Sequence, residues 1–189
     1  MKQLITLLSL LTLFSACSQQ ANDQSQLESE ANHPLIVAAE SGDLPTITKL
    51  IDEKSPVDVK DACMWTPLMK SALNGHLEVT QRLLDAGAQV NQVDKGGYSA
   101  MMLAVSNNHY QIADRLLNHG ANVDQIEQTG GWSALIWAAK LGHTESVKTL
   151  LAHNANPDIK DFDKMSAMDW AKKNQHIEIV KLLETTQSQ

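Results

Sequence analysis

Apolar and small residues recur along the chain in pairs of short groups with helical spacing. In the stretch 66–87, the first group lies within residues 68–72 and the second within residues 77–84. Residues three or four positions apart lie on one face of an α-helix, so each group predicts a short amphipathic helix. A turn residue, Gly75, separates the groups. The pattern therefore predicts two helices that are joined by a tight turn.

This helix pair repeats with a period of about 33 residues. The repeats begin with HPLIVAAESGD at His33, TPLMKSALNGH at Thr66, SAMMLAVSNNH at Ser99, SALIWAAKLGH at Ser133 and SAMDWAKKNQH at Ser166. Successive starts are 33, 33, 34 and 33 residues apart. Five units at one period predict a repeat architecture, in which neighbouring units stack and bury a continuous core.

The residues at the predicted helix ends agree with this assignment. Thr or Ser stands at the N-cap position of four units, and Pro34 and Pro67 occupy the first helical position. Second helices close on Gly87, Gly120 or Asn154, whereas Lys54 occupies that place in the first unit, where we expect backbone strain. The residues that end the first helices are Gly42, Gly75, Asn108, Gly142 and Gln175.

The units resemble the ankyrin repeat in TPLM at 66–69, NGHLEVTQRLLDAGAQVN at 74–91, NHGANVD at 118–124 and LGHTESVKTLLAHNANPD at 141–158. The resemblance covers residues 33 to about 184. It implies an all-α repeat solenoid of about five stacked helix-turn-helix units with hairpin fingers. Met64 and Lys164 stand where a fingertip glycine is expected, and Gly131 looks like a one-residue insertion in the third finger. These departures predict less regular fingertips.

Residues 1–16 predict a lipoprotein signal peptide. Lys2 precedes a mostly apolar stretch at 4–14, which is shorter than the roughly 20 residues that a membrane span needs. Ser15-Ala16 before Cys17 resembles a bacterial lipobox, which implies cleavage before Cys17 and lipid attachment to it. Cleavage by ordinary signal peptidase is the alternative. By the same resemblance, Ser18 after the cysteine implies an outer-membrane anchor that faces the periplasm.

Residues 17–32 predict a lipidated cysteine and a flexible tether, because Leu27 is the only large apolar residue of 18–32. The repeat domain then occupies residues 33–189. The formal net charge of the chain is −7, which argues against nucleic acid or an anionic membrane as the partner. We expect contact with the membrane only through the lipid on Cys17, and a monomeric protein.

The sequence predicts neither an enzyme nor a cofactor or metal site. It contains no G-x-S-x-G, no H-E-x-x-H and no glycine-rich phosphate loop. Cys63 is interpreted as a tolerated free cysteine, with an intermolecular disulfide or a redox role as alternatives. The histidines that recur once per unit are interpreted as turn residues that bond backbone groups: His76, His109, His143 and His176.

The aromatic residues fall into two sets of equivalent positions. Trp65, Tyr98 and Trp132 directly precede the N-caps, where hairpin packing and partner contact are both possible. Leu103, Trp137 and Trp170 share the fifth position of the first helix, counted from its cap, and predict an apolar patch on the concave surface.

The predicted function is binding of an unidentified protein partner on the concave surface. The partner could be an envelope enzyme that needs a scaffold or chaperone-like cofactor, or a periplasmic toxin that needs an immunity-type inhibitor. A redox protein that uses Cys63 and a purely structural role in the envelope are the alternatives from other classes.

Overall fold

The computed structural model describes residues 33–186 and forms five helix pairs in this range. The predicted signal peptide and tether, 1–32, and residues 187–189 lie outside it. The first helices of the pairs are α3 (Pro34–Ser41), α5 (Pro67–Leu73), α7 (Ala100–Ser106), α9 (Ala134–Leu141) and α11 (Ala167–Lys173). The second helices are α4 (Leu44–Asp52), α6 (Leu77–Asp85), α8 (Tyr110–Asn118), α10 (Thr144–Ala152) and α12 (Ile177–Thr186).

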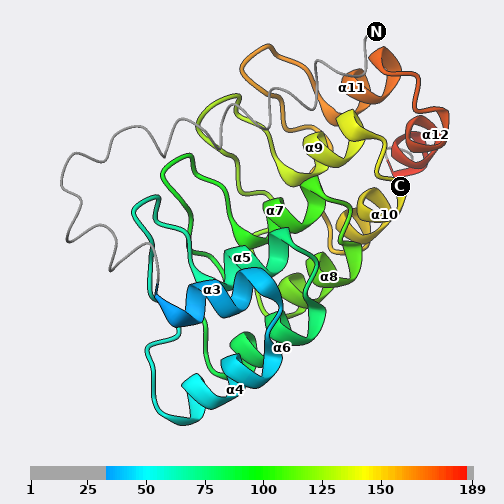
Figure 1. Ribbon diagram of the computed structural model, residues 1–189. Helices are drawn as coiled ribbons and strands as arrows, with labels where there is room; N and C mark the ends of the chain where they lie inside the picture. Colours follow the sequence, from blue (N-terminus) through cyan, green and yellow to red (C-terminus); the bar gives the residue numbers. More distant parts are fainter. Residues whose placement is uncertain (1–32, 187–189) are drawn as a thin grey trace, which may run out of the picture.

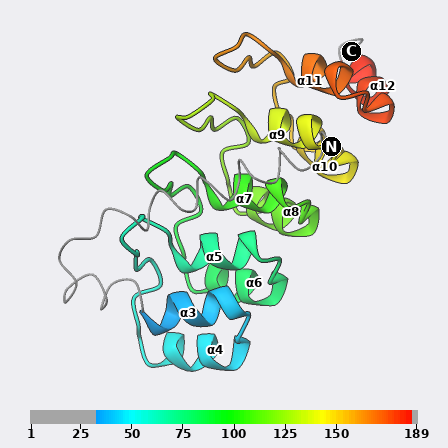
Figure 2. The same cartoon turned by 45° about the horizontal axis from the view of Figure 1, so that its top comes forward.

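The five pairs stack in chain order, as Figures 1 and 2 show. First helices pack against first helices, from α3 through to α11, and second helices form a parallel row from α4 to α12. Figure 2 shows the connecting segments extending from the same side of the stack, beyond the first helices. This arrangement confirms the predicted all-α repeat solenoid.

The core repeats with the sequence. Leu83, Leu116, Leu150 and Leu183 occupy one register position on successive second helices, and all four are completely buried. Burial of a leucine side chain contributes about 1.5–3 kcal/mol relative to exposure. Each unit supplies such residues to both of its neighbours, so the stack has one continuous core.

The predicted caps and turns are confirmed. The hydroxyls of Thr66, Ser99, Ser133 and Ser166 each accept a hydrogen bond from the amide three residues later. The residues that end the first helices all have positive φ, between 59° and 81°. Lys54 also has the left-handed conformation, with φ of 67°, which costs a non-glycine residue about 1–2 kcal/mol.

The recurring histidines connect neighbouring units. A ring nitrogen of His76 lies 3.0 Å from the Glu40 carbonyl oxygen at the end of α3, and His143 bonds the Val105 carbonyl at 2.9 Å in the same way. The ring of His76 fills the space beside Gly42, where an added Cβ would lie 2.6 Å from it. The interpretation of these histidines as residues that bond backbone groups is therefore confirmed.

The four segments between units, 53–66, 86–99, 119–133 and 153–166, are the fingers, numbered one to four here. In the described residues, fingers two to four each contain one isolated bridge at the base, such as Val93 with Ser99, and no finger contains a strand. The fingers also bond to one another at their tips. The amides of Lys95, Gln128 and Phe162 donate to carbonyl oxygens of the preceding finger.

One carboxylate holds the turn of each finger. Asp94 Oδ1 accepts hydrogen bonds from the amides of Gly96 and Tyr98, which lie two and four residues later. Glu127 takes this place in finger three, is 1% exposed, and accepts from the amides two, three and five residues later. Finger three is one residue longer than finger two. The bridge at its base joins Ile126 to Ser133, seven residues apart, whereas the bridge of finger two joins Val93 to Ser99, six residues apart.

The extra residue of finger three is Thr129, so the assignment of the insertion to Gly131 is wrong. Gly131 has a φ of 71° and matches Gly97, at 84°, directly before the aromatic residue. The Gly130 carbonyl oxygen accepts a hydrogen bond from an amide of the next finger, as the Gly96 carbonyl oxygen does. This leaves Thr129 without a counterpart in finger two. The glutamate has one more methylene than the aspartates, and this extra reach lets it span the longer turn.

We expect Glu127→Asp to lower the free energy of unfolding by about 1–3 kcal/mol, because the shorter side chain leaves turn amides without acceptors. In a chain that lacks Thr129, the same substitution should cost much less, since the finger then has the length that aspartate fits. A double-mutant cycle in urea measures this coupling. Additive effects would contradict the length matching.

Candidate partner-binding site

The predicted site residues come from two kinds of element. Trp65, Tyr98 and Trp132 stand at the bases of fingers one to three, and each reaches the next finger. The side chain of Trp65 hydrogen-bonds to Asp94, Tyr98 Oη lies 3.0 Å from Thr129 Oγ1, and Trp132 Nε1 donates to Asp161 Oδ2 at 3.1 Å. The finger aromatics therefore pack between adjacent hairpins, as one of the two interpretations of the sequence predicts.

Four aromatic rings form a continuous cluster over units three to five. Trp132 and Trp137 meet edge to face, with ring centroids 4.7 Å apart. The ring centroids of Tyr98 and Trp137 lie 6.4 Å apart, and those of Trp132 and Trp170 lie 6.3 Å apart. Edge-to-face pairs of this kind contribute about 0.5–1.5 kcal/mol beyond the area that they bury.

Asp161 fixes two of these rings. Its Oδ2 atom accepts hydrogen bonds from the indole nitrogens of both Trp132, at 3.1 Å, and Trp170, at 2.7 Å. Its Oδ1 atom accepts from the Met165 amide and holds the turn of finger four. Burial alone would raise the pKa of Asp161, but the hydrogen bonds from Trp170, Met165 and Trp132 outweigh it and hold the pKa below its usual range.

Two lysines lie over the indoles. Lys140 Nζ is 3.6 Å from the ring centroid of Trp132 and 4.1 Å from that of Trp170, and Lys173 Nζ is 4.4 Å from the Trp170 centroid. Both ammonium groups therefore contact the same indole by cation–π interaction. Burial lowers the pKa of Lys140, while Asp161 acts in the opposite direction. Lys140 is half-buried and Lys173 is exposed, so the cluster is covered by positive charge.

A family model for ankyrin repeats matches residues 35–127 and 124–187, which together cover most of the chain. The chain belongs to the ankyrin-repeat family. No curated protein matches the chain. In ankyrin stacks, the surface formed by the fingers and first helices is the concave one, and the aromatic cluster with its two lysines lies between these elements.

The ankyrin stack brings the predicted helix residues together but buries them. Leu103 is 6% exposed, Trp137 is 5% exposed and Trp170 is 8% exposed. The expectation that they form an apolar patch on the concave surface is wrong in this respect, because all three are buried. Trp132 packs against both tryptophans, and Lys140 and Lys173 lie over Trp170. The role of the three helix residues in partner binding stays a prediction. Because they are buried, they can affect a partner only by supporting the residues that cover them.

Lys140 and Lys173 were not predicted from the sequence. Each lies three residues after a tryptophan of the helix position, Trp137 and Trp170. Residues with this spacing are neighbours on a helix surface, so the repeated Trp-x-x-Lys spacing is a signal that could have identified them. A further exposed residue, Phe162, projects from finger four and is 62% exposed; its ring lies against Gly131 of finger three.

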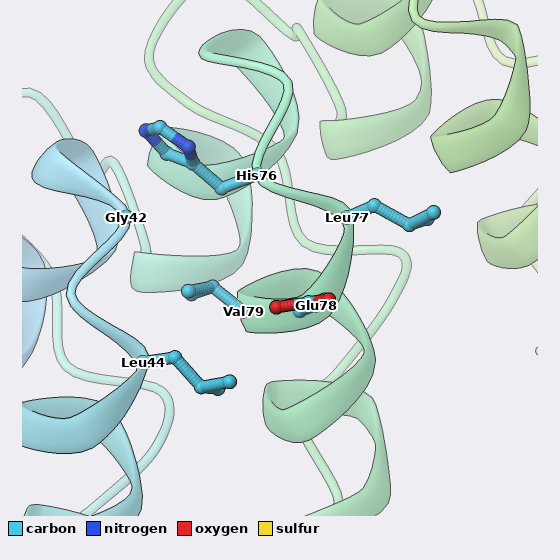
Figure 3. Close-up of a pocket in the computed structure, with 6 residues that line it drawn as sticks. All are labelled: Gly42, Leu44, His76, Leu77, Glu78 and Val79. Atoms are coloured by element: carbon cyan, nitrogen blue, oxygen red, sulfur yellow. The ribbon is translucent and has the colours of Figure 1, made fainter.

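A second feature is an open hollow of about 300 Å³ between units one and two, shown in Figure 3. It is lined by Gly42, Leu44, His76, Leu77, Glu78 and Val79. The ring of His76 is committed to the Glu40 carbonyl. No group of three or more potential metal ligands occurs among residues 33–186. The hollow therefore presents one exposed carboxylate-bearing side chain on mainly apolar walls, without convergent polar groups.

Cys63 differs from its interpretation as a free cysteine. It is half-buried on finger one, packs against the core and is disulfide-bonded. The expectation of a free thiol at Cys63 is therefore wrong. The other cysteine of the chain, Cys17, lies outside the described residues.

We expect Asp161→Asn to lower the free energy of unfolding at pH 7 by about 1–3 kcal/mol, because an amide cannot replace a carboxylate that accepts two indole N–H groups and a backbone amide. The pKa of Asp161 is lowered by folding, so its stabilisation is present above the ordinary value of 3.8 and is lost as the pH falls through the lowered pKa. Urea unfolding at a series of pH values measures the difference between the proteins.

The exposed neighbour Asp163 provides the matched control, since Asp163→Asn removes the same charge beside the same finger. A cost at pH 7 that is equal for the two variants would contradict the role assigned to Asp161. The role would also be contradicted if Asp161→Asn lowered the free energy of unfolding by the same amount at the lowest pH as at pH 7.

Proposed function

We propose that this protein is a non-enzymatic binding module of the bacterial envelope, whose protein partner docks on the concave surface over units three to five. Ankyrin repeats generally mediate protein–protein interaction and are typically not enzymes. The observation that carries the proposal is the aromatic cluster with its two lysines. Four rings from two fingers and two first helices are fixed by mutual contact and by Asp161, so little conformational freedom remains to be lost on binding.

The composition of this surface supports the choice of a protein partner. Trp, Tyr and cationic groups over a well-packed apolar base are typical of the residues that dominate binding energy in protein interfaces. The second helices present a different surface. Their exposed residues are mostly polar, and two of their cations pair within the chain, Arg82 with Asp52 and Lys148 with Glu145 and Glu178.

The envelope location rests on the sequence of residues 1–17. The short apolar stretch and the lipobox-like Ser15-Ala16-Cys17 support cleavage, lipidation of Cys17 and an anchor in the outer membrane that faces the periplasm. The polar segment 18–32 then supplies the tether. None of the helices in residues 33–186 is long and apolar enough to cross a membrane. In this account the protein is a monomer, and its partner is an envelope enzyme or, alternatively, a periplasmic toxin that it inhibits.

A photo-reactive amino acid placed along the chain in living cells tests the docking surface. We expect cross-links to one partner protein from the concave positions Ser106 and Phe162, because a docked partner covers them. The second-helix positions Lys49 and Gln81 are matched controls on the opposite side of the stack and should give none. Cross-links to that partner only from the control positions would overturn the proposal. The identity of the partner separates an envelope enzyme from a toxin.

The variant Cys17→Ser tests the anchor, because it removes the proposed lipid attachment site. We expect it to move the protein from the membrane fraction to the soluble periplasmic fraction. Cys63→Ser is the control and should leave the protein in the membrane fraction, since Cys63 carries no lipid in this account. The chain has two cysteines, so a disulfide of Cys63 and a lipid on Cys17 exclude each other within one chain, and the proposal concerns the processed, lipidated protein. A Cys17–Cys63 disulfide in the wild-type protein from cells, found by mass spectrometry of the unreduced chain, would contradict the lipid anchor.

A further inference from the structure

We propose that Lys140 and Lys173 form a docking point for an acidic segment of the partner, whose Asp or Glu carboxylates bind the two ammonium groups above the indole of Trp170. This inference rests on the proposed function, because it specifies the chemistry of the contact on the same surface. It goes further by committing to the charge of the partner and to the two residues that recognise it.

The first step is the state of the two lysines. Both contact the same indole ring, so they are neighbours on one surface. Within residues 33–186, no carboxylate oxygen lies within ion-pair distance of either ammonium group, although Lys70 and Arg82 pair with Glu40 and Asp52. An ammonium group carries three hydrogen-bond donors. The cation–π contacts orient Lys140 and Lys173 but leave these donors available.

The second step concerns the acidic residues close to the cluster. Asp161 is 2% exposed and uses both oxygens to accept hydrogen bonds from two indoles and a backbone amide. Glu127 is similarly committed to the turn of finger three. Asp163, exposed on finger four, is the acidic neighbour of Lys140 that holds no turn in this way. The accessible part of the cluster therefore carries more positive than negative charge.

The third step is that the unsatisfied polar groups of the cluster are donors. Besides the two lysines, Trp137 Nε1 is buried with no hydrogen-bond partner among the described residues. Because Trp137 is covered, a ligand reaches only the two ammonium groups, and it must supply acceptors for them. A carboxylate supplies two acceptor oxygens with negative charge, and charge-assisted hydrogen bonds to ammonium are stronger than neutral ones.

The fourth step is the position of the charge along the stack. The residues of units one to three equivalent to Lys140 and Lys173 are Glu40, Leu73 and Ser106. Positive charge at this register position is therefore confined to units four and five, where α9 and α11 lie side by side (Figure 2). Exposed Phe162 on finger four adds an apolar contact beside them. The arrangement fits an acidic segment and disfavours a basic one.

The test uses a blocked hexaglutamate peptide as the probe and the intrinsic tryptophan fluorescence of residues 17–189 as the signal, at low ionic strength. We expect a saturable change, because carboxylates that bind Lys140 and Lys173 alter the surroundings of Trp132 and Trp170. The variant Lys140→Gln/Lys173→Gln should bind the peptide at least roughly tenfold more weakly. Thermal unfolding verifies that each variant is folded.

The matched control is Lys49→Gln/Lys181→Gln, which removes two exposed lysines from second helices and changes the net charge equally. It should bind hexaglutamate as the wild type does. Equal weakening in both variants, no saturable change up to roughly millimolar peptide, or tighter binding of hexalysine would each overturn the proposal. Preference for phosphatidylglycerol vesicles over the peptide would also overturn it, by indicating a membrane surface. Concave-surface cross-links without hexaglutamate binding would refute this inference while leaving the proposed function intact.

Discussion

Contact between neighbouring units is the constraint on which the rest of this structure depends. A single helix pair has an apolar side that it cannot cover by itself, so each unit is stable only against the next. The completely buried leucines at one register position of the second helices show this directly, since their surroundings come from adjacent units. Two sets of hydrogen bonds also join each unit to the one before it. The histidine rings bond carbonyl oxygens at the end of the preceding first helix, and fingertip amides donate to carbonyl oxygens of the preceding finger.

The candidate site is a product of this stacking. Tyr98 comes from finger two, Trp132 from finger three, Trp137 from α9 and Trp170 from α11, so no single unit contains the cluster. Asp161 both holds the turn of finger four and fixes the indoles of its neighbours. Loss of stacking at unit five would therefore remove Trp170, Lys173 and the base on which Lys140 rests. Stability and the proposed binding therefore depend on the same contacts.

The sequence predicted most of the fold because the features that encode it are local and repeated. Caps, left-handed turn residues and helical spacing are set within about ten residues, and five copies make them unambiguous, even where Lys54 and Gln175 replace glycine. The insertion in finger three was detected, but its position was not, since the choice between Thr129 and Gly131 depends on which residue takes positive φ and which carbonyl bonds the next finger.

The candidate site was less predictable, because it depends on contacts between units. Periodicity placed Trp137 and Trp170 on the correct side of their helices. It gave no measure of how far Trp132 and Lys140 cover them, since that depends on contacts between a finger and the helices of neighbouring units. The finger aromatics were easier, since their equivalent positions before each cap made contact between hairpins one of the two interpretations of the sequence.

Hydrogen exchange of the repeat domain, alone and with the partner recovered by cross-linking, tests the central claim most directly. The claim is that a rigid concave surface over units three to five binds that partner. The account predicts slowed exchange in residues 128–141 and 161–173 on binding, with exchange in α6, α8 and α10 unchanged. Slowed exchange confined to these second helices would contradict it.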